Sequence, residues 1–314
     1  MIAQLALQAL GAAVVAYGAL TFAYFVWRVC LRPAYDLKMR YGSGWALVTG
    51  ATDGIGKALA TELAKAGFNV LLVSRTQSKL DEVASELKGK FPSVQVDTLA
   101  VDFASFSADA QKAVVARVAA MKDSGGLCAL VNNVGVGYDY PMYFHEMPHD
   151  VVASMLRVNC DSVAIMTHLC LPAMLERKGK AKKGLVMNVA SASGLGSLPL
   201  LAHYSATKAY VIRLTEGLAA EYPALDVNVQ APYYVVSKLS KFKRASLTVP
   251  TPAAYVVLAL DCVGYETVSN PHWAHSVMGV GLNQLLPTPI SDAMLVSMHK
   301  AVRAKALSKK NKGE

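Results

Sequence analysis

A long uncharged stretch opens the chain. Residues 2–27 contain no charged side chain, and only Gln4, Gln8 and Thr21 are clearly polar. A helix of this length, rising about 1.5 Å per residue, spans a hydrocarbon core about 30 Å thick. A cleaved signal peptide is the alternative, but no basic residue precedes the run and its length exceeds about 15 residues. The pattern therefore predicts a transmembrane helix within residues 1–32.

Short apolar runs alternate with helical patterns in the rest of the chain. Residues 56–67 and 77–90 have apolar side chains at helical spacing, and long helical stretches separate the later runs. Val/Leu-rich strands separated by helices predict an α/β fold with a doubly wound parallel sheet, which binds ligands at the carboxyl ends of its strands. The predicted strands are residues 45–50, 69–75, 95–103, 127–135, 184–191 and 226–232.

The charges near the apolar stretch indicate its orientation. Arg28, Arg32, Lys38 and Arg40 follow it, and no basic side chain precedes it. The positive-inside rule therefore places the remainder of the chain in the cytosol. The five cysteines are odd in number and lack metal-ligand spacing, so we expect reduced thiols and no metal site.

The net charge of +9 is concentrated in two segments. Residues 300–314 carry six Lys/Arg against one Glu, and residues 176–184 carry five against one. A nucleic-acid site would need a coherent groove with aromatic partners, which the sequence does not show, so anionic membrane lipid is the favoured partner. Lys310 and Lys312 are fifth and third from the carboxyl terminus, a spacing that resembles the cytosolic retrieval signal of endoplasmic-reticulum membrane proteins.

A glycine-rich segment, TGATDGIG at residues 49–56, joins the first strand to the first helix. Its glycines permit a tight turn, close approach of a pyrophosphate and close helix–strand packing, and the helix directs its positive end at the phosphates. Arg75 ends the second strand where an NAD site has an acid, and so favours the 2′-phosphate of NADPH. The residues assigned to the loop are Gly50, Thr52, Asp53, Gly54, Ile55 and Gly56.

Three polar residues further along the chain suggest hydride-transfer chemistry. Tyr204 and Lys208 are four apart and share one helix face. We expect the Lys208 ammonium to lower the phenol pKa of Tyr204 from about 10, which makes proton exchange near neutrality efficient. Ser191, thirteen residues before Tyr204, is the expected hydrogen-bond donor to the carbonyl being reduced, and Ser193 is the alternative donor.

Together these motifs resemble the short-chain dehydrogenase/reductase family over residues 44–240. The resemblance implies a Rossmann-type fold and further site residues. Asp102 would contact the adenine ring, and the VNNVG turn, with Asn132, Asn133 and Gly135, would touch the adenosine ribose. Asn159 would hold a water for proton relay to the lysine. The implied catalytic tetrad is Asn159, Ser191, Tyr204 and Lys208.

One branch of that family, the very-long-chain 3-oxoacyl-CoA reductases related to type 12 17β-hydroxysteroid dehydrogenases, is more similar still. The shared stretches are residues 132–144, 188–208 and 231–252, where Pro232-Tyr233 replaces the Pro-Gly of most members. The resemblance implies NADPH-dependent reduction of long-chain 3-oxoacyl-CoA to 3-hydroxyacyl-CoA in microsomal fatty-acid elongation. A steroid or other lipid-ketone dehydrogenase is the alternative, and a non-catalytic membrane scaffold is a more distant one.

The sequence also predicts substrate contacts, a cellular location, partners and a division of the chain into five parts. Tyr138 and Ser191 are the expected substrate contacts, and the expected location is the endoplasmic-reticulum membrane with a cytosolic catalytic domain. Expected partners are a long-chain acyl-CoA and membrane lipid, with a homodimer and contacts to a condensing enzyme, dehydratase and enoyl reductase left open. The parts are the anchor (1–32), a linker (33–43), the NADP-binding domain (44–250), an apolar helical extension facing substrate or membrane (251–299) and a basic tail (300–314).

Overall fold

The computed structural model describes residues 1–177, 183–281 and 286–312, so most of the basic loop after Arg177 lies outside the described part. The chain forms two compact units, Met1–Ala34 and Tyr35–Glu314. The first is the helix α1 (Ile2–Val26), which continues through the π-helical turn η1 (Trp27–Leu31). This 30-residue helix has a mean hydropathy of 1.8 and no buried residue, as expected of a candidate membrane span.

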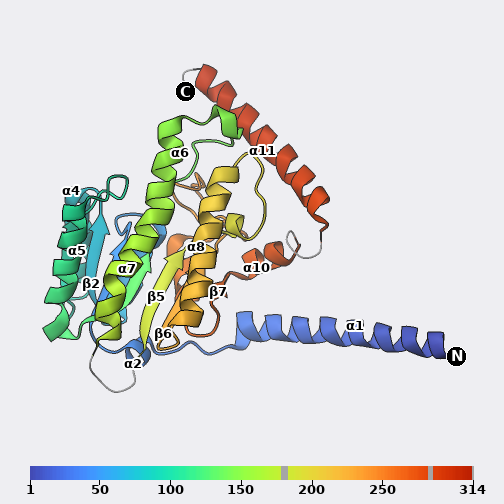
Figure 1. Cartoon of the computed structure of the whole chain (residues 1–314), viewed down its shortest axis with the longest axis horizontal. Coiled ribbons are helices and arrows are strands. Elements are labelled where there is room, and N and C mark those ends of the chain that lie inside the picture. Colours follow the sequence, from blue (N-terminus) through green and yellow to red (C-terminus); the bar gives the residue numbers. More distant parts are fainter. Residues whose placement is uncertain (178–182, 282–285, 313–314) are drawn as a thin grey trace. The chain divides into compact units, whose positions relative to one another are not determined.

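A seven-stranded parallel sheet organises the second unit, in the order β3-β2-β1-β4-β5-β6-β7 (Figure 1). All six predicted strands are confirmed, and the doubly wound fold with them. The two-residue strand β7 was not predicted, because two residues are too few to show a period. The strands are β1 (Trp45–Thr49), β2 (Asn69–Ser74), β3 (Val96–Ala100), β4 (Leu127–Asn132), β5 (Gly184–Val189), β6 (Leu225–Gln230) and β7 (Val268–Ser269).

Helices cover both faces of this sheet. One core contains side chains of α3 (Gly54–Lys65), α4 (Gln77–Lys90) and α9 (Pro252–Asp261). The other contains side chains of α5 (Ala108–Ala120), α7 (Ser162–Leu175) and α8 (Ala202–Glu221). Side chains of a strand alternate between its faces, so Ala46 and Val48 of β1 join the first core and Trp45 and Leu47 the second.

The helix α6 (His149–Leu156) runs into α7 through a π-helical turn, η4 (Arg157–Asp161). The continuous helix His149–Leu175 is also long and apolar enough to span a membrane, but 56% of its most apolar window is buried within the protein. A helix buried to this extent belongs to the core of the second unit. Shorter elements are η2 (Lys122–Ser124), η3 (Phe144–Glu146), η5 (Ala192–Gly194) and α10 (Trp273–Val280).

The predicted linker, residues 33–43, contains a short helix, α2 (Leu37–Tyr41), that packs into the second unit. Tyr41 is fully buried, and its hydroxyl donates to the carboxylate of Asp226 at 2.8 Å. Arg40 binds the same carboxylate through Nε at 2.5 Å and Nη2 at 3.1 Å. Lys183 adds a third contact at 3.0 Å. Asp226 lies near the start of β6, so this network lies at the amino ends of the strands.

The chain ends in one long helix, α11 (Thr288–Asn311), which crosses the predicted boundary between the apolar extension and the basic tail. His299 is buried, and its Nδ1 lies 2.7 Å from the carbonyl oxygen of Pro199. Arg303 forms an ion pair with Glu146 at 2.6 Å. These contacts continue the helix past residue 300, where the sequence pattern changes from apolar to basic.

Candidate active site

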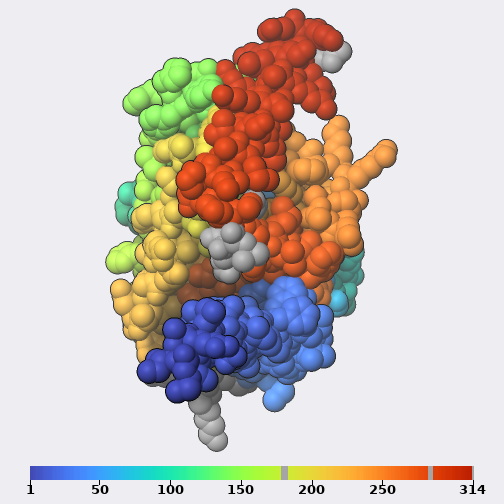
Figure 2. Space-filling model, turned by 90° about the vertical axis from the view of Figure 1, so that its right-hand side faces the viewer, coloured from blue at the N-terminus to red at the C-terminus, as the bar shows by residue number. Residues whose placement is uncertain are grey.

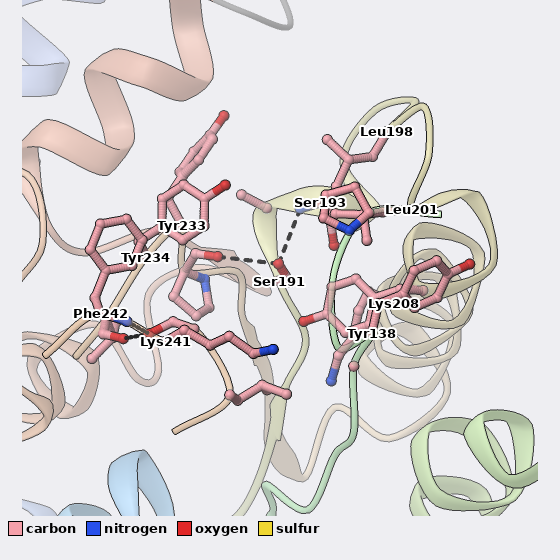
Figure 3. Close-up of a pocket in the computed structure, with 18 of the residues that line it drawn as sticks. Tyr138, Ser191, Ser193, Leu198, Leu201, Lys208, Tyr233, Tyr234, Lys241 and Phe242 are labelled. Carbon is pink, nitrogen blue, oxygen red and sulfur yellow. Dashed lines mark hydrogen bonds between the residues drawn. The ribbon is translucent and has the colours of Figure 1, made fainter. Parts of the chain in front are cut away.

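A large cavity of about 1680 Å³ lies at the carboxyl ends of the strands. Its walls come from the loops that follow β1, β4, β5 and β6, together with one side of α11. Figure 3 shows Ser191 between Tyr233 and Tyr234 on one side and Tyr138 and Lys208 on the other. Parallel α/β sheets bind their ligands at this edge, so the cavity is where the fold predicts the active site.

The glycine loop has the geometry of a phosphate cradle. Gly50 and Gly54 have φ of +64° and +55°, a region that favours glycine. A Cβ on Gly50 would lie 2.9 Å from Nδ2 of Asn133. Asp53 caps α3 by accepting the Gly54 N–H at 2.8 Å, so the helix N-terminus faces the cavity that the loop lines. This backbone fits a dinucleotide pyrophosphate.

Other predicted cofactor residues fall into three groups. Asn133 and Gly135 line the cavity, as Ile55 does, and Asn133 holds the loop by donating Nδ2 to the carbonyl of Thr49 at 3.0 Å. Asn132 instead is buried within the sheet, where it donates to Asn188 and Thr167. Four more residues lie outside the cavity lining: Thr52, which hydrogen-bonds Ser74 at 3.1 Å, Gly56, where a Cβ would lie 2.3 Å from the carbonyl oxygen of Gly50, and the exposed Arg75 and Asp102.

Tyr204 and Lys208 lie on α8 and both line the cavity. The Lys208 side chain is only 3% exposed, and its ammonium donates to the carbonyl of Val189 at 3.2 Å. The ammonium is 5.8 Å from the centroid of the Tyr204 ring. Burial lowers the pKa of Lys208 to about 8.

The expected lowering of the Tyr204 pKa is not found in the protein alone. Burial raises this pKa, a hydrogen bond with Ser191 lowers it only in part, and Tyr234 raises it further. The prediction considered the charge of Lys208 but not the removal of the phenol from water, which is the larger effect here. Tyr204 is therefore a protonated phenol near neutrality, which suits a proton donor.

The two serines have different surroundings. Ser191 Oγ accepts the N–H of Ser193 at 3.2 Å and donates to the carbonyl of Pro232 at 3.4 Å (Figure 3). The Ser193 hydroxyl oxygen is buried and has no hydrogen-bond partner among the described residues. Because Ser191 contacts the Tyr204 hydroxyl and Ser193 Oγ is enclosed, the geometry favours Ser191 as the carbonyl donor.

Asn159 lies in the π-helical turn between α6 and α7 and is 1% exposed. Its amide accepts the N–H of Val136 at 2.8 Å and donates to the Val136 carbonyl at 2.9 Å. It also donates to Thr207 Oγ1 at 3.0 Å. Asn159 thus ties the loop after β4 to α8, the helix of Tyr204. Tyr138 accepts the backbone N–H of His203 at 3.2 Å and lines the same cavity.

The sequence pattern did not single out some cavity residues. Lys238 pairs with Asp53 at 2.7 Å, which lowers the pKa of that carboxyl. Tyr233 and Tyr234 precede it, and side chains of α11 complete the wall. In the sequence, residues 231–252 stand out only by their resemblance to the reductase branch, and the fold brings Lys238 of this segment to Asp53 of the glycine loop.

A family model described as short chain dehydrogenase matches residues 44–247. The chain belongs to this family. Among curated relatives, very-long-chain 3-oxoacyl-CoA reductase-B of Danio rerio is 42% identical over 273 residues, covering 86% of this chain and 84% of the relative. Very-long-chain 3-oxoacyl-CoA reductase of Homo sapiens is 40% identical over 309 residues, covering 96% and 95%.

Solved structures agree with the fold. A 7beta-hydroxysteroid dehydrogenase superposes with a TM-score of 0.71 at 23% identity, covering 83% of this chain and 99% of its own. A 3-ketoacyl-(acyl-carrier-protein) reductase from Brucella melitensis, complexed with NADH, has a TM-score of 0.62 at 28% identity and covers 72% and 95%. The chain is thus an oxidoreductase with a nicotinamide cofactor, as the motifs predicted.

Proposed function

We propose that this protein reduces long-chain and very-long-chain 3-oxoacyl-CoA to 3-hydroxyacyl-CoA with NADPH. The observation that carries the proposal is the position of Ser191, Tyr204 and Lys208 on the wall of one cavity of about 1680 Å³. A drug-sized ligand needs about 300–1,000 Å³, so this volume has room for a cofactor and a long substrate together. The names of the relatives support the same substrate class.

The chain's own residues perform the proton chemistry. Ser191 donates its hydroxyl hydrogen to the substrate carbonyl oxygen and orients it beside Tyr204. Tyr204 transfers its phenolic proton to the same oxygen as negative charge develops there. When bound at the glycine loop, a nicotinamide cofactor would supply the hydride to the carbonyl carbon. Lys208, when protonated, stabilises the phenolate that remains on Tyr204.

Arg75 supports the choice of NADPH over NADH. It follows β2 and is exposed, without a hydrogen-bond or ion-pair partner among the described residues, so its guanidinium is available to a 2′-phosphate. We expect Arg75→Ala to weaken NADPH binding by about 1.5–3 kcal/mol, the usual contribution of a hydrogen bond to a charged group. Fluorescence titration with each cofactor measures this. An equal loss with NADH would mean that Arg75 is structural.

The cellular setting is part of the proposal. We place the helix of residues 2–31 in the endoplasmic-reticulum membrane and the catalytic domain, residues 44–250, in the cytosol. Residues 251–299 would face substrate or membrane, and membrane lipid and other elongation enzymes would be partners. Lys312 is the C-cap residue of α11, and Lys310 lies in the last turn of that helix, so a retrieval signal there would be presented at a helix end.

A direct assay tests the function. Full-length protein in a mild detergent is given 3-oxoacyl-CoA esters of graded length with NADPH or NADH, and cofactor oxidation is followed. We expect turnover that favours NADPH and long chains. Turnover of 17-oxosteroids but not of the esters would favour the steroid alternative. Absence of turnover with either class of substrate would favour the alternative of a non-catalytic membrane scaffold.

A further inference from the structure

Three lysines that the proposed chemistry does not use lie on the cavity wall. Lys305, Lys309 and Lys310 come from the last turns of α11, and all three are exposed. Within residues 1–177, 183–281 and 286–312, none of these ammonium groups has an ion-pair or hydrogen-bond partner. They are cations at one end of the active-site cavity, and no acid among the described residues neutralises them.

The lysines continue an apolar stripe on the same side of α11. Met294, Met298 and Val302 line the cavity and are 54%, 44% and 49% exposed. Lys305 and Lys309 follow at the same spacing of three and four residues, which keeps all five on one helix face. The face is therefore apolar along its first turns and cationic along its last. Figure 2 shows α11, in red, crossing this side of the catalytic unit between the yellow-green and orange segments.

Side-chain contacts fix this helix against the catalytic loop. His299 hydrogen-bonds the carbonyl of Pro199 at 2.7 Å, and Ser197 binds Asp292. The middle of α11 thus lies against the loop that follows Ser191. Leu295 of α11 also lines the cavity, and at about 1.5 Å per residue Lys305 and Lys309 are about 15 and 21 Å further along the helix. That range is comparable with an extended pantetheine arm.

The acids of the cavity do not offset these lysines. Asp53 and Asp139 are the acidic residues in its described lining. Asp53 already pairs with Lys238 at 2.7 Å, and among the described residues neither Asp53 nor Asp139 forms an ion pair with the three lysines. The aromatic part of the lining, with Tyr234 and Phe242, belongs to a different loop. The end of the cavity at Lys305, Lys309 and Lys310 therefore suits anions.

We propose that Lys305, Lys309 and Lys310 bind the phosphate groups of the CoA moiety. The inference rests on the proposed function and adds the orientation of the substrate. The thioester lies beside Ser191, the acyl chain extends toward Tyr234 and Phe242, and the pantetheine arm follows the apolar stripe of α11 to the lysines. Ammonium groups hold phosphate by charge-assisted hydrogen bonds.

Two other roles of the lysines make different predictions. Cations in the last turn offset the helix dipole, which affects the stability of α11 but not the choice of substrate. Lipid headgroups also carry phosphate, and a role of the lysines in binding them is measured by binding to anionic membranes. A substrate without phosphate separates both roles from ours.

The test compares two thioesters of the same 3-oxoacyl chain, one of CoA and one of N-acetylcysteamine, which lacks the phosphates. Wild-type full-length protein and the triple variant Lys305→Ser, Lys309→Ser, Lys310→Ser are assayed in neutral detergent. We expect wild type to favour the CoA ester in kcat/KM and the triple variant to lose about tenfold of that preference, chiefly through KM. Lys300→Ser, on the same helix but outside the cavity lining, should keep the wild-type preference.

Several outcomes would overturn the inference. One is an unchanged preference in the triple variant, and another is equal use of both esters by wild type, which would leave the reductase activity itself intact. A triple variant that keeps the preference for the CoA ester but loses a wild-type preference for anionic over neutral vesicles would assign the lysines to headgroups. Failure of wild type to reduce either ester would instead contradict the proposed function. Adenosine 3′,5′-bisphosphate should inhibit wild type competitively and the triple variant less.

Discussion

The two ends of the sheet each bury a charge, and they treat it in opposite ways. At the carboxyl ends, Lys208 is 3% exposed, and burial lowers its pKa to about 8. At the amino ends, Asp226 is 7% exposed. Burial raises the pKa of Asp226, but hydrogen bonds from Arg40, Tyr41 and Lys183 outweigh it and lower the pKa. In the part of the chain that the structure describes, the Lys208 ammonium has no carboxylate partner, whereas the Asp226 carboxylate is surrounded by donors.

This difference separates reactivity from stability. An uncompensated buried charge costs free energy but has a pKa near the working pH, which suits proton chemistry. A fully paired charge joins segments that are distant in sequence, here α2, the start of β5 and β6. Substitutions at the two ends should therefore change different observables.

The largest effect should follow Tyr204→Phe. The ring remains, but the proton donor is lost, so we expect turnover to fall by about a hundredfold to ten-thousandfold. The free energy of unfolding and the affinity for the cofactor should change little. Steady-state kinetics and cofactor titration measure both. Tyr210→Phe, on the same helix with an exposed ring, is the control, and near-normal rates in Tyr204→Phe would contradict the mechanism.

At the other end, Asp226→Asn should destabilise the fold and spare the chemistry. It removes the anion but leaves Arg40 and Lys183 near an amide. Breaking a buried pair costs about 3–5 kcal/mol, and we expect about 3 because both cations reach solvent. Chemical denaturation in detergent measures the loss. Asp109→Asn, in an exposed pair, should cost below about 0.5 kcal/mol. A large loss of turnover per folded Asp226→Asn molecule would break the division between the two ends.

The residues at the catalytic end of the sheet could be predicted from the sequence, whereas the network at the amino end could not. Gly50, Ser191, Tyr204 and Lys208 lie in local motifs whose spacing is set by one turn or one helix, so the pattern alone locates them. Arg40 and Asp226 are 186 residues apart, and no local pattern connects them. The same limit applies to α11, because only its packing on the loop at Pro199 shows that a basic tail is a cavity wall.

Lys208→Met should change the free energy of unfolding less than Asp226→Asn does, and in the opposite direction. Because the folded pKa of about 8 lies below the ordinary 10.5, the folded protein loses this proton more readily than the unfolded chain. The buried cation is thus a penalty that is fully present below about pH 8 and disappears as pH rises toward 10.5.

Lys208→Met should therefore lower turnover while raising the free energy of unfolding at pH 7 by about 1–2 kcal/mol. The gain should shrink as pH rises through 8 to 10.5. Denaturation of both proteins at pH 7 and pH 10 measures it. A destabilised Lys208→Met at pH 7 would mean that the bond to Val189 outweighs the burial of charge.

The smallest effect should come from Lys183→Ser. Its side chain is 41% exposed and makes one contact with Asp226, whereas Arg40 makes two and Tyr41 is fully buried. A partly solvated pair contributes below about 1 kcal/mol and is screened by salt, so the loss should nearly vanish at 1 M salt. Denaturation at low and high salt measures this. If the loss in the free energy of unfolding equals that of Asp226→Asn and persists at high salt, Lys183 is the main partner of the carboxylate. The network at the amino ends of the strands would then depend on the segment before β5 rather than on α2.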